Sequence, residues 1–179
     1  MKPKPPTPIG RPAAPRPSTA VPIGYCGYAS PLGAMVLAAQ GPALWGVWFS
    51  GQQHMPAMQD WQATSTPVLQ EAVAQLSAYF AGQRQHFDLP LARDRGTAFQ
   101  AQVWARLQHI GYGQSCSYAD IAKDIGKPHA VRAVGAAIGR NPWSIVVPCH
   151  RVLGRNGTLT GYAGGLERKR ALLQLENPA

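Results

Sequence analysis

The stretch Ile145-Val146-Val147-Pro148-Cys149-His150-Arg151-Val152 determines how the rest of the chain is interpreted. Residues 145–147 are apolar and β-branched, which predicts a short buried strand or extended segment. Pro148 lacks an N–H group and has a fixed φ angle, so it ends any strand at this point. Cys149 therefore follows a rigid, buried segment, a suitable place for a reactive side chain. The alternative is that Cys149 is a small buried apolar residue without a chemical role.

The chain has 179 residues, 45% of them hydrophobic, which is enough for one large domain or two small ones. Its three cysteines are too few and too scattered for a disulfide framework, and no Cys/His cluster has zinc spacing. This composition indicates a reducing, cytoplasmic environment. No apolar run approaches the roughly 18 residues of a membrane span, and no apolar signal-peptide segment follows the N-terminus. We therefore expect no membrane association.

Charge is distributed unevenly along the chain, whose formal net charge is +9. Residues 17–83 contain no Lys or Arg, whereas residues 84–179 contain thirteen of them against six Asp or Glu. Such an asymmetry indicates that only the second half contacts a polyanion, and nucleic acid is the favoured candidate. The alternative is a basic surface that only contributes to solubility.

The first half is predicted to be a small α+β domain over residues 23–93. Residues 1–22 hold eight of the seventeen prolines, so we expect a disordered basic tail before this domain. Alternating apolar runs predict an antiparallel sheet with strands at 25–29, 35–39 and 44–49. Residues 51–65 are expected to form a loop, and Thr66-Pro67 is a typical start for the helix that ends at Gly82.

Three aromatic residues of this predicted sheet have two possible roles. Tyr25, Trp45 and Trp48 could stack on nucleic-acid bases, but no basic residue is interleaved with them in the sequence. We therefore expect them to pack the sheet.

The second half, residues 97–179, is predicted to be a mostly helical domain. Thr97 is expected to cap its first helix, and Ser117 with Asp120 has the capping-box pattern at the start of a short helix. A second short helix is expected over about 129–139. The two short helices together predict a helix-turn-helix. An ordinary helical hairpin within the core would have the same pattern. A final helix is expected over 166–175, with residues 168–170 exposed.

A cysteine is a nucleophile only as a thiolate, so a base is needed near Cys149. His150 is adjacent, but neighbours on an extended chain point in opposite directions, so a bridging water or a helical turn is required. Such a histidine needs an acceptor on its other ring nitrogen, and Glu176 is the candidate on the same C-terminal unit. The alternative for Glu176 is a solvated carboxylate near the terminus.

The segment Pro148-Cys149-His150-Arg151-Val152 resembles the active-site signature of the O6-alkylguanine-DNA alkyltransferases, also called methylated-DNA–protein-cysteine methyltransferases. Several flanking features are similar to the family pattern over residues 23–176: Asn141-Pro142, Tyr118, Arg132, Tyr162-Ala163-Gly164-Gly165 and Glu176. The resemblance implies a ribonuclease H-like first domain, followed by a DNA-binding and active-site domain.

The resemblance also implies a role for each matching residue. Cys149 would accept the alkyl group irreversibly in a single turnover, His150 would take its proton through water, and Glu176 would orient His150. Asn141 would hold the turn before the cysteine. The implied base-binding residues are Tyr118, Val152, Tyr162 and Ala163, and the implied DNA-binding residues are Arg132, Ala133, Gly135 and Ala136.

The implied partner is double-stranded DNA that contains O6-alkylguanine, or O4-methylthymine, bound by a monomer. The target base would be flipped out of the duplex, and Arg132 would fill the gap. The resemblance implies no cofactor for this transfer, and we expect no metal, because Cys26 is the only cysteine of the first domain.

Three alternative functions remain open at this point. A non-catalytic protein that binds alkylated DNA is disfavoured because such proteins lack the acceptor cysteine. A cysteine–histidine hydrolase would need a histidine that faces the thiol and an oxyanion hole, and the other histidines follow no such pattern. A plain helix-turn-helix regulator would explain the charge but not the cysteine signature.

Overall fold

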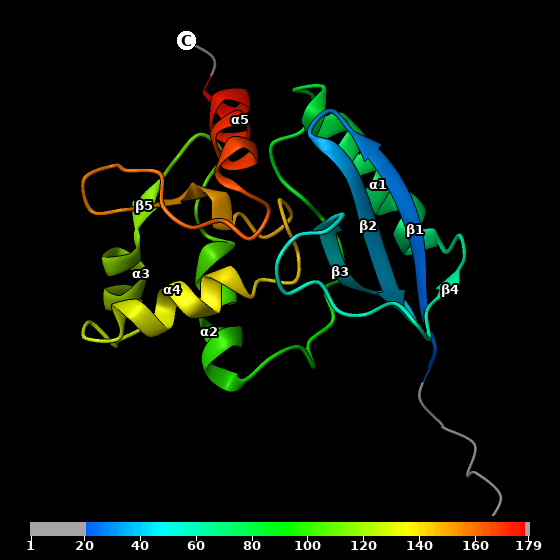
Figure 1. The fold of residues 1–179 in the computed structure, drawn as a ribbon, viewed down its shortest axis with the longest axis horizontal. Helices are drawn as coiled ribbons and strands as arrows, with labels where there is room; N and C mark the ends of the chain where they lie inside the picture. Colours follow the sequence, from blue (N-terminus) through cyan, green and yellow to red (C-terminus); the bar gives the residue numbers. More distant parts are fainter. Residues whose placement is uncertain (1–20, 178–179) are drawn as a thin grey trace, which may run out of the picture.

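The computed structural model describes residues 21–177, which form two lobes side by side (Figure 1). We call residues 23–93 the sheet lobe and residues 97–177 the helical lobe. The α+β class predicted from the sequence is confirmed, with an antiparallel sheet and a helix followed by a mostly helical part. The tail predicted for residues 1–22 lies outside the described residues, apart from its last two positions.

The sheet lobe contains a four-stranded sheet in the order β3-β2-β1-β4. β1 (Ile23–Ser30), β2 (Gly33–Gln40) and β3 (Ala43–Phe49) form the predicted antiparallel meander. Gly33 at the start of β2 and Gly41 in the turn after β2 have φ angles of 112° and 57°, a conformation in which a side chain would be strained. β4 (Gln62–Ala63) pairs parallel with β1, so the loop predicted over 51–65 contains a short strand.

Helix α1 (Pro67–Phe80) begins as predicted, with the Thr66 side chain accepting a hydrogen bond from the Leu69 N–H group. Its apolar face covers the sheet at the back in Figure 1. The fully buried side chains at this contact include Leu69, Ala72, Leu76 and Tyr79. Tyr79 thus carries a phenol hydroxyl into the interior.

The helical lobe contains α2 (Ala98–Leu107), α3 (Tyr118–Asp124), α4 (Val131–Gly139) and α5 (Leu166–Glu176). Capping boxes at Thr97/Gln100 and Ser117/Asp120 begin α2 and α3. The short strands β5 (Cys116–Ser117) and β6 (Val152–Leu153) pair in parallel. α4 begins at Val131 rather than at about 129, because the preceding Lys127–Ala130 segment forms a turn.

The extended segment predicted for residues 145–147 is wrong. These residues form a tight turn, and Ile145 has a φ angle of 72° although it is β-branched. Cys149 then begins a single 3-10 turn, η1 (Cys149–Arg151). The β-branched run therefore reflects burial and not strand formation, because all three side chains are buried.

The edge strand β3 of the sheet lobe is hydrogen-bonded to the helical lobe. The Val47 N–H group donates to the Pro142 carbonyl at 2.8 Å, and the Ser144 N–H group donates to the Val47 carbonyl at 2.9 Å. The Trp143 indole donates to the Leu44 carbonyl at 2.9 Å. The segment that precedes Cys149 is thus hydrogen-bonded to the sheet as though it were another strand.

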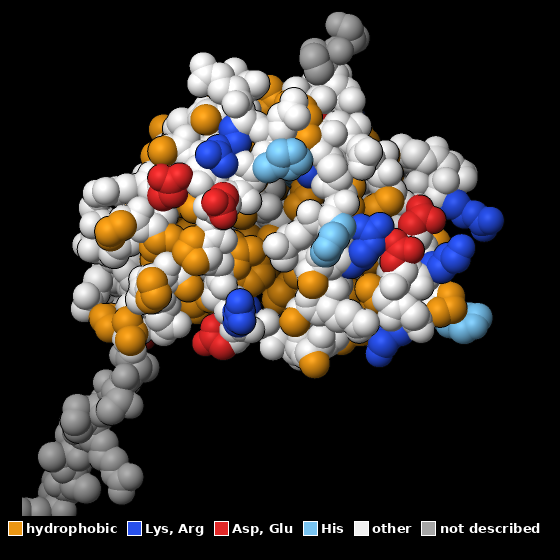
Figure 2. Space-filling model, turned by 180° about the vertical axis from the view of Figure 1, so that it is seen from behind, with side chains coloured by type: hydrophobic (Ala, Val, Ile, Leu, Met, Phe, Trp, Pro, Cys, Tyr) orange, Lys and Arg blue, Asp and Glu red, His pale blue; other side chains and the backbone are white. Residues whose placement is uncertain are grey.

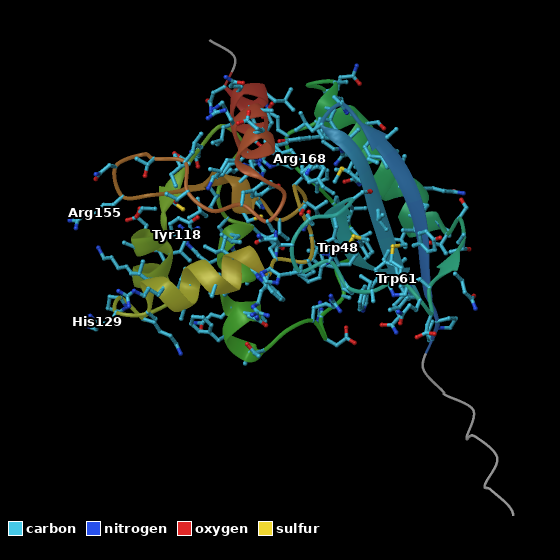
Figure 3. All side chains as sticks on the ribbon, viewed as in Figure 1. Trp48, Trp61, Tyr118, His129, Arg155 and Arg168 are labelled. Atoms are coloured by element: carbon cyan, nitrogen blue, oxygen red, sulfur yellow. The ribbon has the colours of Figure 1, made fainter. Side chains whose placement is uncertain are left out.

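The aromatic residues of the sheet pack against one another, as predicted. Trp48 is buried and contacts Trp45 and Trp61, with ring centroids 5.8 Å away in both cases (Figure 3). The Arg95 guanidinium stacks on Trp45 at 3.5 Å from the ring centroid. A cation is therefore brought to the cluster from the connection between the lobes and not from the strands.

The basic side chains lie mainly on the helical lobe. Figure 2 shows Lys and Arg gathered on the half of the molecule that α2–α5 form, on the right in that view. Within residues 21–177, no helix is both long enough and apolar enough to cross a lipid bilayer.

Candidate functional site

Cys149 is buried, with only 6% of its surface exposed, and Asn141 holds its thiol. The Asn141 Nδ2 atom lies 3.1 Å from the Cys149 Sγ atom and donates to the Val147 carbonyl at 2.8 Å. The Asn141 side chain therefore spans the turn that contains Ile145 and fixes the sulfur relative to it.

The electrostatic surroundings of the thiol act in opposite directions. Burial raises the pKa of Cys149, whereas the hydrogen bond from Asn141 and the positive charge of Lys169 lower it. Burial prevails, so the pKa stays above its ordinary value and the resting group is a thiol. A nucleophilic role for Cys149 thus requires a base to take its proton.

His150 is fully buried and bound to Glu176, as expected from the sequence. The His150 Nε2 atom lies 2.8 Å from the Glu176 Oε1 atom. Burial lowers the pKa of His150 despite this carboxylate, so the imidazole is neutral at pH 7 and Nε2 carries its proton. Nδ1 then has a free lone pair and bonds to no group in the described part of the chain. The structure thus fixes the His150 ring through Nε2 and leaves Nδ1 without a partner among the described residues.

The Glu176 carboxylate binds more groups than the sequence indicated. Arg151 donates to both oxygens at 2.9 Å, the Tyr79 hydroxyl donates to Oε1 at 2.7 Å, and the Gly113 N–H group donates to Oε2 at 3.3 Å. Burial raises the pKa of Glu176, but the hydrogen bonds from His150 and Arg151 outweigh burial and bring it to about 2. Glu176 is therefore ionised, and the solvated alternative is wrong.

Lys169 was expected to be exposed but is fully buried. Its Nζ atom donates to the carbonyls of Val152 at 2.6 Å and Thr160 at 2.8 Å. Burial lowers the pKa of Lys169 to about 8, and Cys149 opposes that shift only when it is a thiolate. The positions of Lys169, Leu172 and Glu176 have helical spacing and form the buried face of α5. That spacing is the sequence signal by which Lys169 could have been found.

A cavity of about 390 Å³ lies between α4 and the loop of residues 160–163. Its lining brings together Tyr118, Tyr162, Ala163 and Gly135. Burial raises the pKa of Tyr118 and of Tyr162, so both phenols in the lining are neutral at pH 7. Val152 was predicted to line the same site but is fully buried and is not among the residues that line the cavity.

The exposed face of helix α4 carries small side chains, with Arg132 as the one long exception. Arg132, Ala133 and Ala136 are exposed, and Gly135 lies beside the Tyr118 ring. Figure 3 shows Tyr118 between α4 and the 153–161 loop, with His129 and Arg155 at the outer edge of the helical lobe. The arrangement can accept a polyanion at α4, close to the cavity.

Residues 21–177 contain no group of three or more His, Cys, Asp or Glu side chains placed to hold a metal ion. The side chains that the structure brings together around Cys149 offer their own chemistry. They form a buried thiol, a neutral imidazole, and a carboxylate that binds that imidazole.

Comparison with known families matches both lobes. A model described as the ribonuclease-like domain of 6-O-methylguanine DNA methyltransferase matches residues 23–93. A model described as the DNA-binding domain of 6-O-methylguanine DNA methyltransferase matches residues 98–178.

Individual relatives are similar over most of their length. The methylated-DNA–protein-cysteine methyltransferase of Mycolicibacterium paratuberculosis is 49% identical over 155 residues, which is 86% of this chain and 92% of that protein. The constitutive enzyme of that name from Bacillus subtilis is 46% identical, over 82% of this chain and 91% of its own. A crystal structure of Mycobacterium tuberculosis OGT in complex with DNA is 47% identical with a TM-score of 0.79, over 86% and 92% of the two chains.

We predict that Glu176→Gln lowers the free energy of unfolding at pH 7 by about 3 kcal/mol or more, because it leaves Arg151 buried without a charge partner. The pKa of Glu176 is depressed from 4.5 to about 2, so its stabilisation is complete above pH 4.5 and is lost as the pH falls through 2. Urea unfolding at several pH values measures both effects. Glu167→Gln, at an exposed residue of the same helix, is the control. Equal stability of the two variants would contradict the prediction.

We predict that Lys169→Met raises the pKa of the Cys149 thiol, because it removes the positive charge that favours the thiolate. The rate of Cys149 carboxamidomethylation by iodoacetamide, followed by peptide mass against pH, should fall by about tenfold for each unit of that rise. Arg170→Met, which removes an exposed charge on the same helix, should leave the profile unchanged. A Lys169→Met profile that matches the wild type would show that this charge does not act on the thiol.

Proposed function

Because the chain belongs to the 6-O-methylguanine DNA methyltransferase family, we propose that it repairs DNA by direct reversal, with Cys149 as the acceptor of the alkyl group. The substrate is duplex DNA that contains O6-alkylguanine, with O4-methylthymine as a second substrate. The observation that carries this proposal is the buried Cys149 thiol held by Asn141, next in sequence to a neutral histidine that is bound to a buried carboxylate.

In the proposed reaction, the Cys149 sulfur attacks the alkyl carbon attached to the guanine O6 atom. A sulfur–carbon bond forms as the carbon–oxygen bond breaks, and the electron pair of that bond leaves with guanine. Tyr118 is the proposed donor of a proton to the departing base, and its raised pKa supports a neutral phenol. The thioether product has no easy reversal, so each molecule acts once.

The thiol proton passes through a water molecule to the Nδ1 atom of His150. Two observations support this path. Nε2 is hydrogen-bonded to Glu176, and Nδ1 has no hydrogen-bond partner among the residues that the structure describes. Transfer creates a thiolate and an imidazolium. Lys169 and Asn141 favour the thiolate, whereas Glu176 favours the imidazolium.

Base flipping is required because the O6 atom lies on the pairing edge of guanine and cannot reach a buried thiol from within the duplex. The cavity that Tyr118, Tyr162 and Ala163 line is the proposed base site. Arg132, exposed on α4, is proposed to occupy the space that the base leaves, and the small side chains of Ala133 and Ala136 allow α4 to approach DNA closely.

We assign residues 23–93 and 97–179 as two domains, which the two family matches support. We assign α3 and α4 as a helix-turn-helix, supported by their mutual packing. We propose that the protein acts as a monomer.

The alternative functions are less well supported. A non-catalytic binding protein has no use for an acceptor thiol, and this chain keeps Cys149 with its supporting residues. A hydrolase needs an imidazole directly at the thiol, whereas His54, His86, His109 and His129 are all exposed. A plain regulator does not account for the buried network around Cys149.

We predict that one methyl group is transferred per protein molecule. The protein is incubated with a duplex that contains a single O6-methylguanine, and intact mass and a peptide map are then taken. One added methyl on the Cys149 peptide, and none in Cys149→Ser, is the expected result. An unchanged mass with tight binding would favour the non-catalytic function, and more than one turnover would contradict the single-use mechanism.

We also predict that Arg132→Ala slows repair of O6-methylguanine in duplex DNA by about tenfold or more, because the flipped state then leaves a gap in the base stack. The rate with free O6-benzylguanine should change little, since no flipping is needed. Single-turnover rates measure both reactions. Equal losses on both substrates would mean that Arg132 does not assist flipping.

A further inference from the structure

The sheet lobe contributes one polar group to the buried relay. The Tyr79 hydroxyl on α1 lies 2.7 Å from the Glu176 Oε1 atom, 97 positions away in sequence. Both side chains are buried. Within residues 21–177, Tyr79 is the only residue of the sheet lobe that hydrogen-bonds to Glu176, His150 or Cys149.

Tyr79 and His150 bind the same carboxylate oxygen. Oε1 accepts from the Tyr79 hydroxyl, the His150 Nε2 atom and the Arg151 Nη2 atom, whereas Oε2 accepts from Arg151 Nε and the Gly113 N–H group. Three donors compete for the lone pairs of one oxygen, so each bond depends on the others. A change at Tyr79 therefore alters the bond between Glu176 and His150.

The aromatic ring of Tyr79 is fixed in place by its neighbours. Its centroid lies 5.4 Å from those of Phe80 and Phe87 and 6.2 Å from that of Tyr112. Burial raises the pKa of Tyr79, and the Glu176 charge raises it further, so the hydroxyl remains a donor throughout the working pH range. The hydroxyl is thus a preorganised donor that needs no rearrangement to hold the carboxylate.

We propose that Tyr79 is a positioning residue through which the sheet lobe holds the Glu176 carboxylate, and hence the His150 base, in the geometry that alkyl transfer needs. This inference rests on the proposed function of Cys149. It assigns the sheet lobe a part in thiol activation in addition to its support of the Asn141–Ser144 segment.

Removal of the Tyr79 hydroxyl has a predictable electrostatic sign. The carboxylate loses a donor and interacts more strongly with the protonated imidazole, so the pKa of His150 rises. A protonated His150 cannot accept the thiol proton, so the rate falls as the pH drops below the pKa of His150. Because that pKa is raised, the acidic limb of the pH–rate profile moves to higher pH. The other titratable or charged groups that face this site are Arg151, Tyr112 and Lys169, and they are unchanged in the experiment.

The test compares Tyr79→Phe with the wild type. The alkyl-transfer rate from an O6-methylguanine duplex and the iodoacetamide rate at Cys149 are both measured against pH. We expect an upward shift of the acidic limb of about half a pH unit, and a rate above that limb reduced roughly threefold or more. Nitrogen NMR shifts of the His150 ring report the same change directly.

Two controls separate positioning from packing. Tyr28→Phe removes another hydroxyl of the sheet lobe, and Phe87→Leu loosens the cluster around Tyr79 but keeps the Tyr79 hydroxyl. Neither variant should move the acidic limb. In a Glu176→Gln background, Tyr79→Phe should have no further effect on it, because both changes act on one bond.

An unshifted limb in folded Tyr79→Phe, or an equal shift in Phe87→Leu, would overturn the proposal. The iodoacetamide profile keeps this test independent of the substrate. A wild-type protein that transfers no methyl group but shows the Tyr79-dependent shift would refute the proposed function and leave the positioning role intact.

Discussion

The buried carboxylate of Glu176 is the constraint on which the rest of the structure depends. A negative charge inside a protein is costly unless hydrogen bonds and an opposite charge compensate it. Here the donors come from α1, the segment around Gly113 and the turn that follows Cys149. These segments are distant in sequence, so the carboxylate is satisfied only when both lobes and α5 have assembled. The same assembly orients His150.

Burial has opposite effects on the pKa values of the two groups between which we propose proton transfer. It raises the pKa of Cys149 and lowers that of His150, so the resting pair is a neutral thiol and a neutral imidazole. In the reaction that we propose, Lys169 near the sulfur and Glu176 at the ring stabilise the charged pair. The protein can therefore keep the thiol unreactive in the absence of substrate and still stabilise the thiolate.

The sheet lobe has two connections to this chemistry. The edge of β3 hydrogen-bonds to the Pro142–Ser144 segment, which fixes the turn that Asn141 spans. Tyr79 on α1 hydrogen-bonds to the carboxylate of Glu176. A lobe without a catalytic cluster in its sequence thus determines where the thiol lies and how its base is held.

The sequence by itself determined the elements with strong local signals, namely the meander, the capped helices, the cysteine signature and the pairing of His150 with Glu176. These follow from side-chain periodicity, capping chemistry and motif spacing, which depend on near neighbours along the chain. Only the tertiary structure decided the left-handed turn at Ile145, the burial of Lys169, and the binding of Glu176 by Tyr79 and Arg151. Each of these depends on groups far apart in sequence, because a buried charge or a strained backbone persists only where distant segments compensate its cost.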